Sequence, residues 1–119
     1  MIRRSAVFFL LLLLAPSPLS AHAYLIKSVP AQRAVLFRAP VKIQLWFNER
    51  LEPRYSSLSL KRADDKPVDI GKVEVNAEDP KQLSVSISPL SAGRYVITYR
   101  VLSVDGHVVQ DQFPFTVKQ

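Results

Sequence analysis

The spacing of apolar residues constrains this fold most, because they recur at every second position over most of the chain after residue 22. The clearest segment, residues 41–47, carries them at Val41, Ile43, Leu45 and Phe47. Successive side chains of a strand point to opposite faces, so this pattern predicts a strand with one buried face. The region after residue 22 contains no stretch that keeps a helical period.

Further strands are predicted at 58–60, 83–87, 95–104 and 109–117, separated by Pro, Gly, Asn and Asp residues. Segment 95–104 is apolar on both faces, which is typical of a central strand. Pro114 indicates an edge position, because proline cannot donate a hydrogen bond to a sheet. Residues 90–95, Leu-Ser-Ala-Gly-Arg-Tyr, are typical of a tyrosine corner or of an ordinary turn with a core Tyr. About seven short strands predict an all-β, immunoglobulin-like β-sandwich, with a small barrel as the alternative.

The first 21 residues have the layout of a secretory signal peptide. Arg3 and Arg4 precede an apolar run over residues 6–15, which is shorter than the ~20 residues of a membrane-spanning helix. We therefore predict a signal peptide at 1–21, a single mature domain at 22–119, a periplasmic location and no stable membrane anchor. Small residues at Ala21 and Ala23 also permit cleavage after Ala23, which would remove His22.

Composition excludes several classes of function. The chain has no cysteine, so it forms no disulfide, no thiolate metal site and no thiol nucleophile. Its formal net charge of +6 falls by two when Arg3 and Arg4 are removed. The remaining basic residues are scattered, and Lys61-Arg62 is their only adjacent pair, so we predict no nucleic-acid partner.

The two histidines of the chain, His22 and His107, are the candidate metal ligands. Cleavage after Ala21 would give His22 a free α-amine beside its imidazole, and the two together can chelate one metal ion. Asp105 and His107 are two residues apart, so they project to the same side of an extended chain, and Gly106 between them allows a sharp turn.

An amine, two imidazoles and a carboxylate form a set of four nitrogen and oxygen donors, which suits copper(II). We predict one copper(II) ion per chain, with zinc as the competing metal. Copper(I) prefers thioether or thiolate donors. The only methionine is Met1, so the mature domain would contain neither kind of donor.

Several segments resemble the CopC family of periplasmic copper-resistance proteins: His-Ala-Tyr-Leu at 22–25, Ser-Val-Pro-Ala at 28–31, Leu-Trp-Phe-Asn-Glu at 45–49, residues 90–95, and Ser-Val-Asp-Gly-His at 103–107. The resemblance implies a Greek-key sandwich that holds copper(II) on His22, Asp105 and His107, with Glu49 near the metal at most as an outer neighbour. Some family members also carry a methionine-rich copper(I) site, which this mature domain could not form.

The predicted function is therefore a periplasmic copper(II) carrier or buffer that passes its ion to an inner-membrane copper transport protein. An enzyme is the weaker alternative, since copper monooxygenases also use an N-terminal histidine. Asp105 would leave fewer open metal positions for a substrate, so we predict no enzymatic activity. A metal-free interaction module is the third hypothesis, in which residues 105–107 are only a turn.

Overall fold

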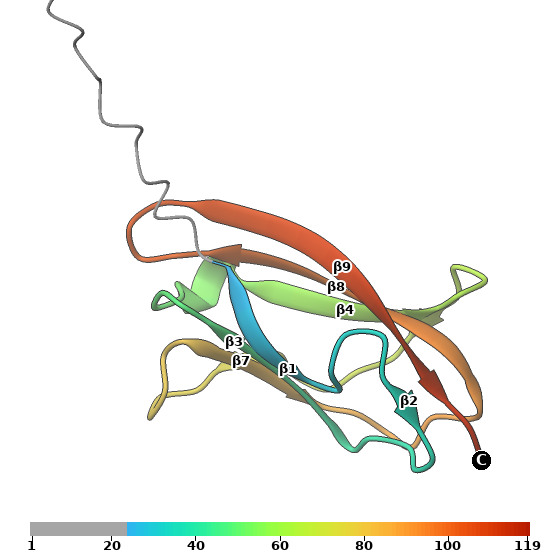
Figure 1. Ribbon diagram of the computed structural model, residues 1–119. Coiled ribbons are helices and arrows are strands. Elements are labelled where there is room, and N and C mark those ends of the chain that lie inside the picture. The colour runs from blue at the N-terminus through green and yellow to red at the C-terminus, as the bar shows by residue number, and fades with distance from the viewer. Residues whose placement is uncertain (1–23) are drawn as a thin grey trace, which may run out of the picture.

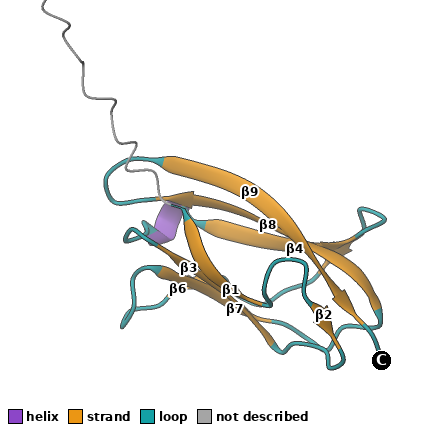
Figure 2. Ribbon diagram, viewed as in Figure 1, coloured by secondary structure: helices purple, strands orange, loops and turns teal. Residues whose placement is uncertain are grey.

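Two β-sheets pack face to face in the computed structural model, which describes residues 24–119 (Figure 1). The first sheet has the strand order β1 (Leu25–Val29), β3 (Lys42–Phe47), β7 (Gln82–Ser86) and β6 (Glu74–Val75). The second has the order β2 (Val35–Leu36), β9 (Val108–Val117), β8 (Gly93–Leu102), β4 (Ser57–Arg62) and β5 (Pro67–Val68). The only helix among these residues is the short 3-10 turn η1 (Pro53–Tyr55), shown in purple in Figure 2. The predicted all-β sandwich is confirmed. The chain crosses between the sheets five times, at β1 to β2, β2 to β3, β3 to β4, β5 to β6 and β7 to β8.

The core forms where the apolar positions of the two sheets meet. In β3, the side chains of Ile43, Leu45 and Phe47 are buried, as the period-two pattern predicts. Val41 was wrongly assigned to this buried face, because the strand begins at Lys42 and Val41 is 71% exposed. The facing sheet contributes buried residues from β4, β8 and β9: Leu58, Leu60, Tyr95, Ile97, Tyr99, Val101, Phe113, Phe115 and Val117.

Strand β8 is central, as predicted, because it pairs with β4 on one side and β9 on the other. Its second face is only partly covered: Val96 and Leu102 are half-buried and Arg100 is exposed. The apolar residues on both faces predicted burial on both, but the sandwich has two layers and buries only the inner face. The strand also ends at Leu102, two residues before its predicted end, and Ser103 begins the turn to β9.

Pro114 lies near an edge of the second sheet. The edge strand β2 pairs only with Thr116 and Val117 of β9. No described strand pairs with the earlier residues of β9 on that side, so a residue without an N–H group is tolerated there. The carbonyl of Pro114 accepts a hydrogen bond from the backbone N–H of Arg33 at 2.7 Å.

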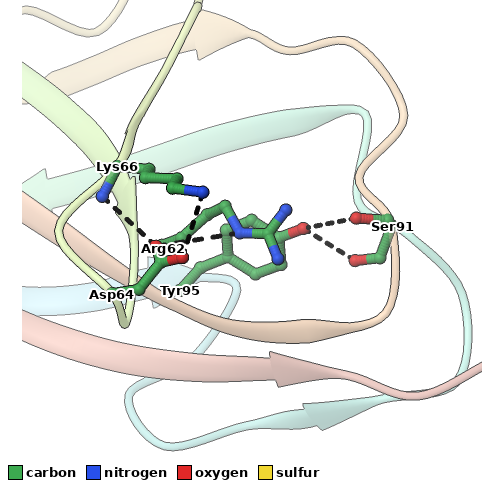
Figure 3. A network of polar contacts seen from close by, with 5 residues as sticks. All are labelled: Arg62, Asp64, Lys66, Ser91 and Tyr95. Carbon is green, nitrogen blue, oxygen red and sulfur yellow. Dashed lines mark hydrogen bonds and ion pairs between the residues drawn. The ribbon is translucent and has the colours of Figure 1, made fainter.

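The tyrosine corner is confirmed. The hydroxyl of Tyr95 donates a hydrogen bond to the carbonyl oxygen of Ser91 at 2.7 Å, and the ring is buried (Figure 3). Arg62 pairs with Tyr95 across the β4–β8 ladder. The two carboxylate oxygens of Asp64 lie 3.9 Å from Nε of Arg62 and 3.9 Å from Nζ of Lys66. These ion pairs lie on the surface and contribute little to stability.

No helix among residues 24–119 is long and apolar enough to cross a membrane.

Candidate metal centre

The turn between β8 and β9 holds two of the three predicted ligands. The backbone N–H of Ser103 donates to the carbonyl of His107 at 2.9 Å, which closes residues 103–107 into a narrow loop. The N–H of Gly106 donates to the carbonyl of Ser103 at 2.9 Å. Gly106 has a φ of 91°, in the region that favours glycine. The prediction that Gly106 allows a sharp turn between Asp105 and His107 is confirmed.

The structure brings Asp105 and His107 into direct contact. Oδ2 of Asp105 lies 3.0 Å from Nδ1 of His107, and the two side chains are 34% and 39% exposed. The hydroxyl of Ser103, a residue that is only 1% exposed, donates a hydrogen bond to Oδ1 of Asp105. This hydrogen bond lowers the pKa of the Asp105 carboxyl below its usual value; partial burial opposes the shift and His107 adds to it. The carboxylate is thus ionised and oriented, as a metal ligand must be.

A second segment joins this turn to the start of the described chain. The N–H of Val104 donates to the carbonyl of Arg50 at 2.9 Å, and Leu51 forms a β-bridge with Ser103. Two residues before Arg50, the side chain of Asn48 accepts a hydrogen bond from the N–H of Tyr24 at 2.6 Å. The start of β1 and the end of β8 therefore lie at the same end of the sandwich (Figure 1).

The remaining predicted ligand, His22, lies outside the described residues, as do the predicted signal peptide and both candidate cleavage sites. Within residues 24–119, no group of three His, Cys, Asp or Glu side chains could hold a metal ion. Asp105 and His107 are thus the two predicted ligands that the structure brings together in this part of the chain. Glu49 lies half-buried in the loop after β3 and makes no hydrogen bond or ion pair with any described residue.

Sequence reasoning missed two residues of this centre, Ser103 and Asn48. Serine in a turn often bonds to nearby backbone groups, and the Ser103 hydroxyl accepts such a bond from the N–H of His107 at 3.2 Å. That signal was available in the sequence. Asn48 gave no such signal, because its partner Tyr24 lies 24 residues earlier in the chain.

Comparison with known proteins identifies the family. The model of the CopC domain matches residues 25–118. The chain belongs to the CopC family. Its CopC fold is similar to the crystal structure of CopC from Methylosinus trichosporium OB3b, with a TM-score of 0.76 and 34% identity over 82% of this chain and 94% of that one. It is also similar to PcoC, a methionine-rich copper resistance protein from Escherichia coli, with a TM-score of 0.74 and 36% identity over 82% of this chain and all of that one.

A third relative carries the same region within a much longer protein. The copper transport protein CutJ of Bacillus subtilis is 28% identical over 112 residues, which make up 93% of this chain. This CopC chain spans only 21% of the length of that relative. The match therefore covers nearly all of the two solved structures, whereas most of the Bacillus protein lies beyond the matched region.

Proposed function

We propose that this CopC protein binds one copper(II) ion through His22, Asp105 and His107 and acts as a periplasmic copper carrier or buffer. Copper binding in copper resistance or homeostasis is the function that family membership supports. The observation that carries the specific site is the contact between the Asp105 carboxylate and the His107 imidazole, held 3.0 Å apart in the β8–β9 turn. The turn is also joined by hydrogen bonds to the loop that holds Tyr24, two residues after His22.

The residues that are present fit copper(II) by their chemistry. The amine and imidazole of His22 would supply two nitrogen donors, His107 a third, and Asp105 an oxygen donor. Such donors suit the tetragonal preference of copper(II), which has the highest affinity of the first-row divalent ions for sites of this kind. The relative PcoC is described as methionine-rich, whereas this sequence has methionine only at position 1. We therefore propose a strong preference for copper(II) over copper(I).

The proposed partner is an inner-membrane copper transport protein. This proposal is supported by the Bacillus relative, which is named a copper transport protein and contains the matching region within a longer chain. In that arrangement the domain is covalently joined to the rest of the protein. A separate CopC chain would reach its acceptor by diffusion in the periplasm after removal of residues 1–21.

We propose a carrier and not an enzyme. Both carboxylate oxygens of Asp105 already have partners, in Ser103 and His107, so the side chain is fixed beside the imidazole. Held there, it would occupy a position around the metal that an oxygen-activating site must leave open. Oxidant-dependent turnover of a polysaccharide by the copper-loaded protein would contradict this part of the proposal.

Native mass spectrometry of the exported protein with one equivalent of copper(II) tests the site directly, because one spectrum gives both the N-terminus and the metal count. We expect a chain that begins at His22 and carries one copper ion. His107→Ala should abolish tight binding, and the matched loop variant Glu49→Gln should largely keep it. A chain that begins at Tyr24, or one that begins at His22 and stays free of metal, would refute the proposed site.

A further inference from the structure

The contact between Asn48 and Tyr24 is a reciprocal pair of hydrogen bonds. The N–H of Tyr24 donates to Oδ1 of Asn48 at 2.6 Å, and the N–H of Asn48 donates to the carbonyl of Tyr24 at 3.2 Å. The ring of Tyr24 contributes little to this anchoring, since the residue is 60% exposed. The position of the chain at Tyr24 therefore depends on its backbone, and on one side chain, that of Asn48.

The hydrogen bond from Tyr24 to Asn48 matters for holding the chain because strand pairing is irregular near the start of β1. Strand β1 pairs with β3 in register over residues 27–29, but the register shifts between Leu25 and Lys27. A bulge of this kind disrupts the ladder, so the residues before it are less firmly held by strand pairing. Leu25 resumes the pairing opposite Phe47, the residue directly before Asn48. Asn48 thus secures the first described residue beyond an irregular stretch of the edge strand.

The opposite side of the same loop is attached to the turn that carries the metal ligands. The carbonyl of Arg50 accepts a hydrogen bond from Val104 at 2.9 Å, and the N–H of Glu52 donates to the carbonyl of Leu102 at 2.8 Å. Residues 48–52 therefore form a bridge with Tyr24 on one side and the end of β8 on the other. A displacement of Tyr24 from this bridge would separate the two halves of the proposed copper site.

We infer that Asn48 is a positioning residue for the N-terminal copper ligand. The inference rests on the proposed function, in which His22 is the first residue of the mature chain. Each residue spans at most about 3.6 Å, so His22 can reach only about 7 Å from the point at which Asn48 holds Tyr24. With that short tether, the anchor keeps the amine and imidazole at the end of the sandwich where Asp105 and His107 lie. Loss of the anchor would leave each donor intact but lower the effective concentration of one half of the site at the other.

The test compares Asn48→Ala with a matched control, Asn76→Ala, in the full exported protein. Asn76 also uses its Oδ1 to accept backbone hydrogen bonds, from Glu78 at 2.9 Å and Asp79 at 3.4 Å, but these lie in the β6–β7 loop. We expect Asn48→Ala to weaken copper(II) binding by about 10- to 100-fold, the usual range for residues that orient a metal ligand. Asn76→Ala should leave the affinity within about twofold, and Asn48→Asp, which keeps an oxygen acceptor for Tyr24, should restore tight binding.

A second readout needs no metal. Hydrogen exchange of the Tyr24 amide, followed by NMR in the copper-free protein, should become faster in Asn48→Ala and stay as in the parent in Asn76→Ala and Asn48→Asp. If Asn48→Ala does not fold, Asn48→Gln displaces the same acceptor by one methylene and is expected to behave in the same way.

The outcomes separate this inference from the proposed function. Faster exchange at Tyr24 with parental copper affinity would overturn the positioning role and leave the copper site standing. Equal losses of affinity in Asn48→Ala and Asn48→Asp would overturn it too, since the acceptor would then not matter. A parent protein that binds no copper, or a His107→Ala variant that binds as the parent does, would instead refute the proposed site itself.

Discussion

Replacement of Ser103 by alanine tests whether the β8–β9 turn is built to present Asp105 and His107. The Ser103 hydroxyl donates to Oδ1 of Asp105 and accepts a hydrogen bond from the backbone N–H of His107 at 3.2 Å. Ser103 is only 1% exposed, so water would not readily replace the lost hydroxyl oxygen. Ser103→Ala thus removes one bond that orients a ligand and one that shapes the backbone, while the N–H and carbonyl of Ser103 keep their own partners.

The size of the effect follows from these two bonds. The neutral bond from the His107 N–H contributes about 1 kcal/mol, which in a domain of this size lowers Tm by about 4–8 °C. Asp105 is exposed enough to turn toward water, so the loss of its bond to Ser103 adds only a small further destabilisation. For copper the loss is of a different kind, because the carboxylate is no longer fixed beside the imidazole. We expect an affinity about 10- to 100-fold weaker, as for other partners that orient metal ligands.

The assay pairs thermal unfolding of the copper-free protein with a copper(II) competition titration. Ser56→Ala is the matched control, because the Ser56 hydroxyl accepts a hydrogen bond from the N–H of Leu102 at 3.3 Å and makes no bond to Asp105 or His107. Both variants should lose stability, and only Ser103→Ala should lose affinity. Parental copper affinity in Ser103→Ala, despite a lower Tm, would refute the argument that Ser103 orients the ligand pair.

Three further predictions concern stability and ionisation. Tyr95→Phe removes the bond to the Ser91 carbonyl and should cost about 1 kcal/mol in urea unfolding, with unchanged copper binding; no loss would mean that the tyrosine corner is energetically neutral. Gly71→Ala would place a Cβ 2.9 Å from the backbone oxygen of Ser86, so we expect a loss of about 1–3 kcal/mol, and parental stability would show that the segment around Gly71 shifts freely. The pKa of Asp105 should lie below 3.8 by carbon NMR titration of the copper-free protein, because hydrogen bonds stabilise its charged form. Its contribution to stability should thus be complete above the unfolded-state pKa and be lost as pH falls through the lower folded value; a titration midpoint above 3.8 would contradict this.

Much of the fold was predictable because burial in a two-layered sandwich follows the alternation of side chains. Ile43, Leu45 and Phe47 face the core for that reason. The wrong predictions concern where a strand begins or ends and how many layers the fold has, because the alternation of side chains gives no information about either. Val41 fits the same pattern but precedes the strand. The apolar residue Val96 points to a face that no third layer of the described residues 24–119 covers. A strand end depends on where its partner ends, which is a property of the folded sheet.

The two halves of the site differ in the same way. Asp105 and His107 could be predicted as a pair because their contact is local: two residues of separation and an intervening glycine bring them together in one turn. The position of Tyr24, the first described residue after His22, is not set locally, because it depends on Asn48 and on a loop that bonds to the end of β8. Short sequence spacing can therefore identify donors, but only the packing of distant segments can bring an N-terminal donor to them. Among the described residues of this CopC protein, Tyr24 is joined to the loop at 48–52 by backbone hydrogen bonds and the Asn48 side chain. We therefore expect copper affinity to respond to changes in the loop at residues 48–52 even though none of the three proposed ligands lies in it.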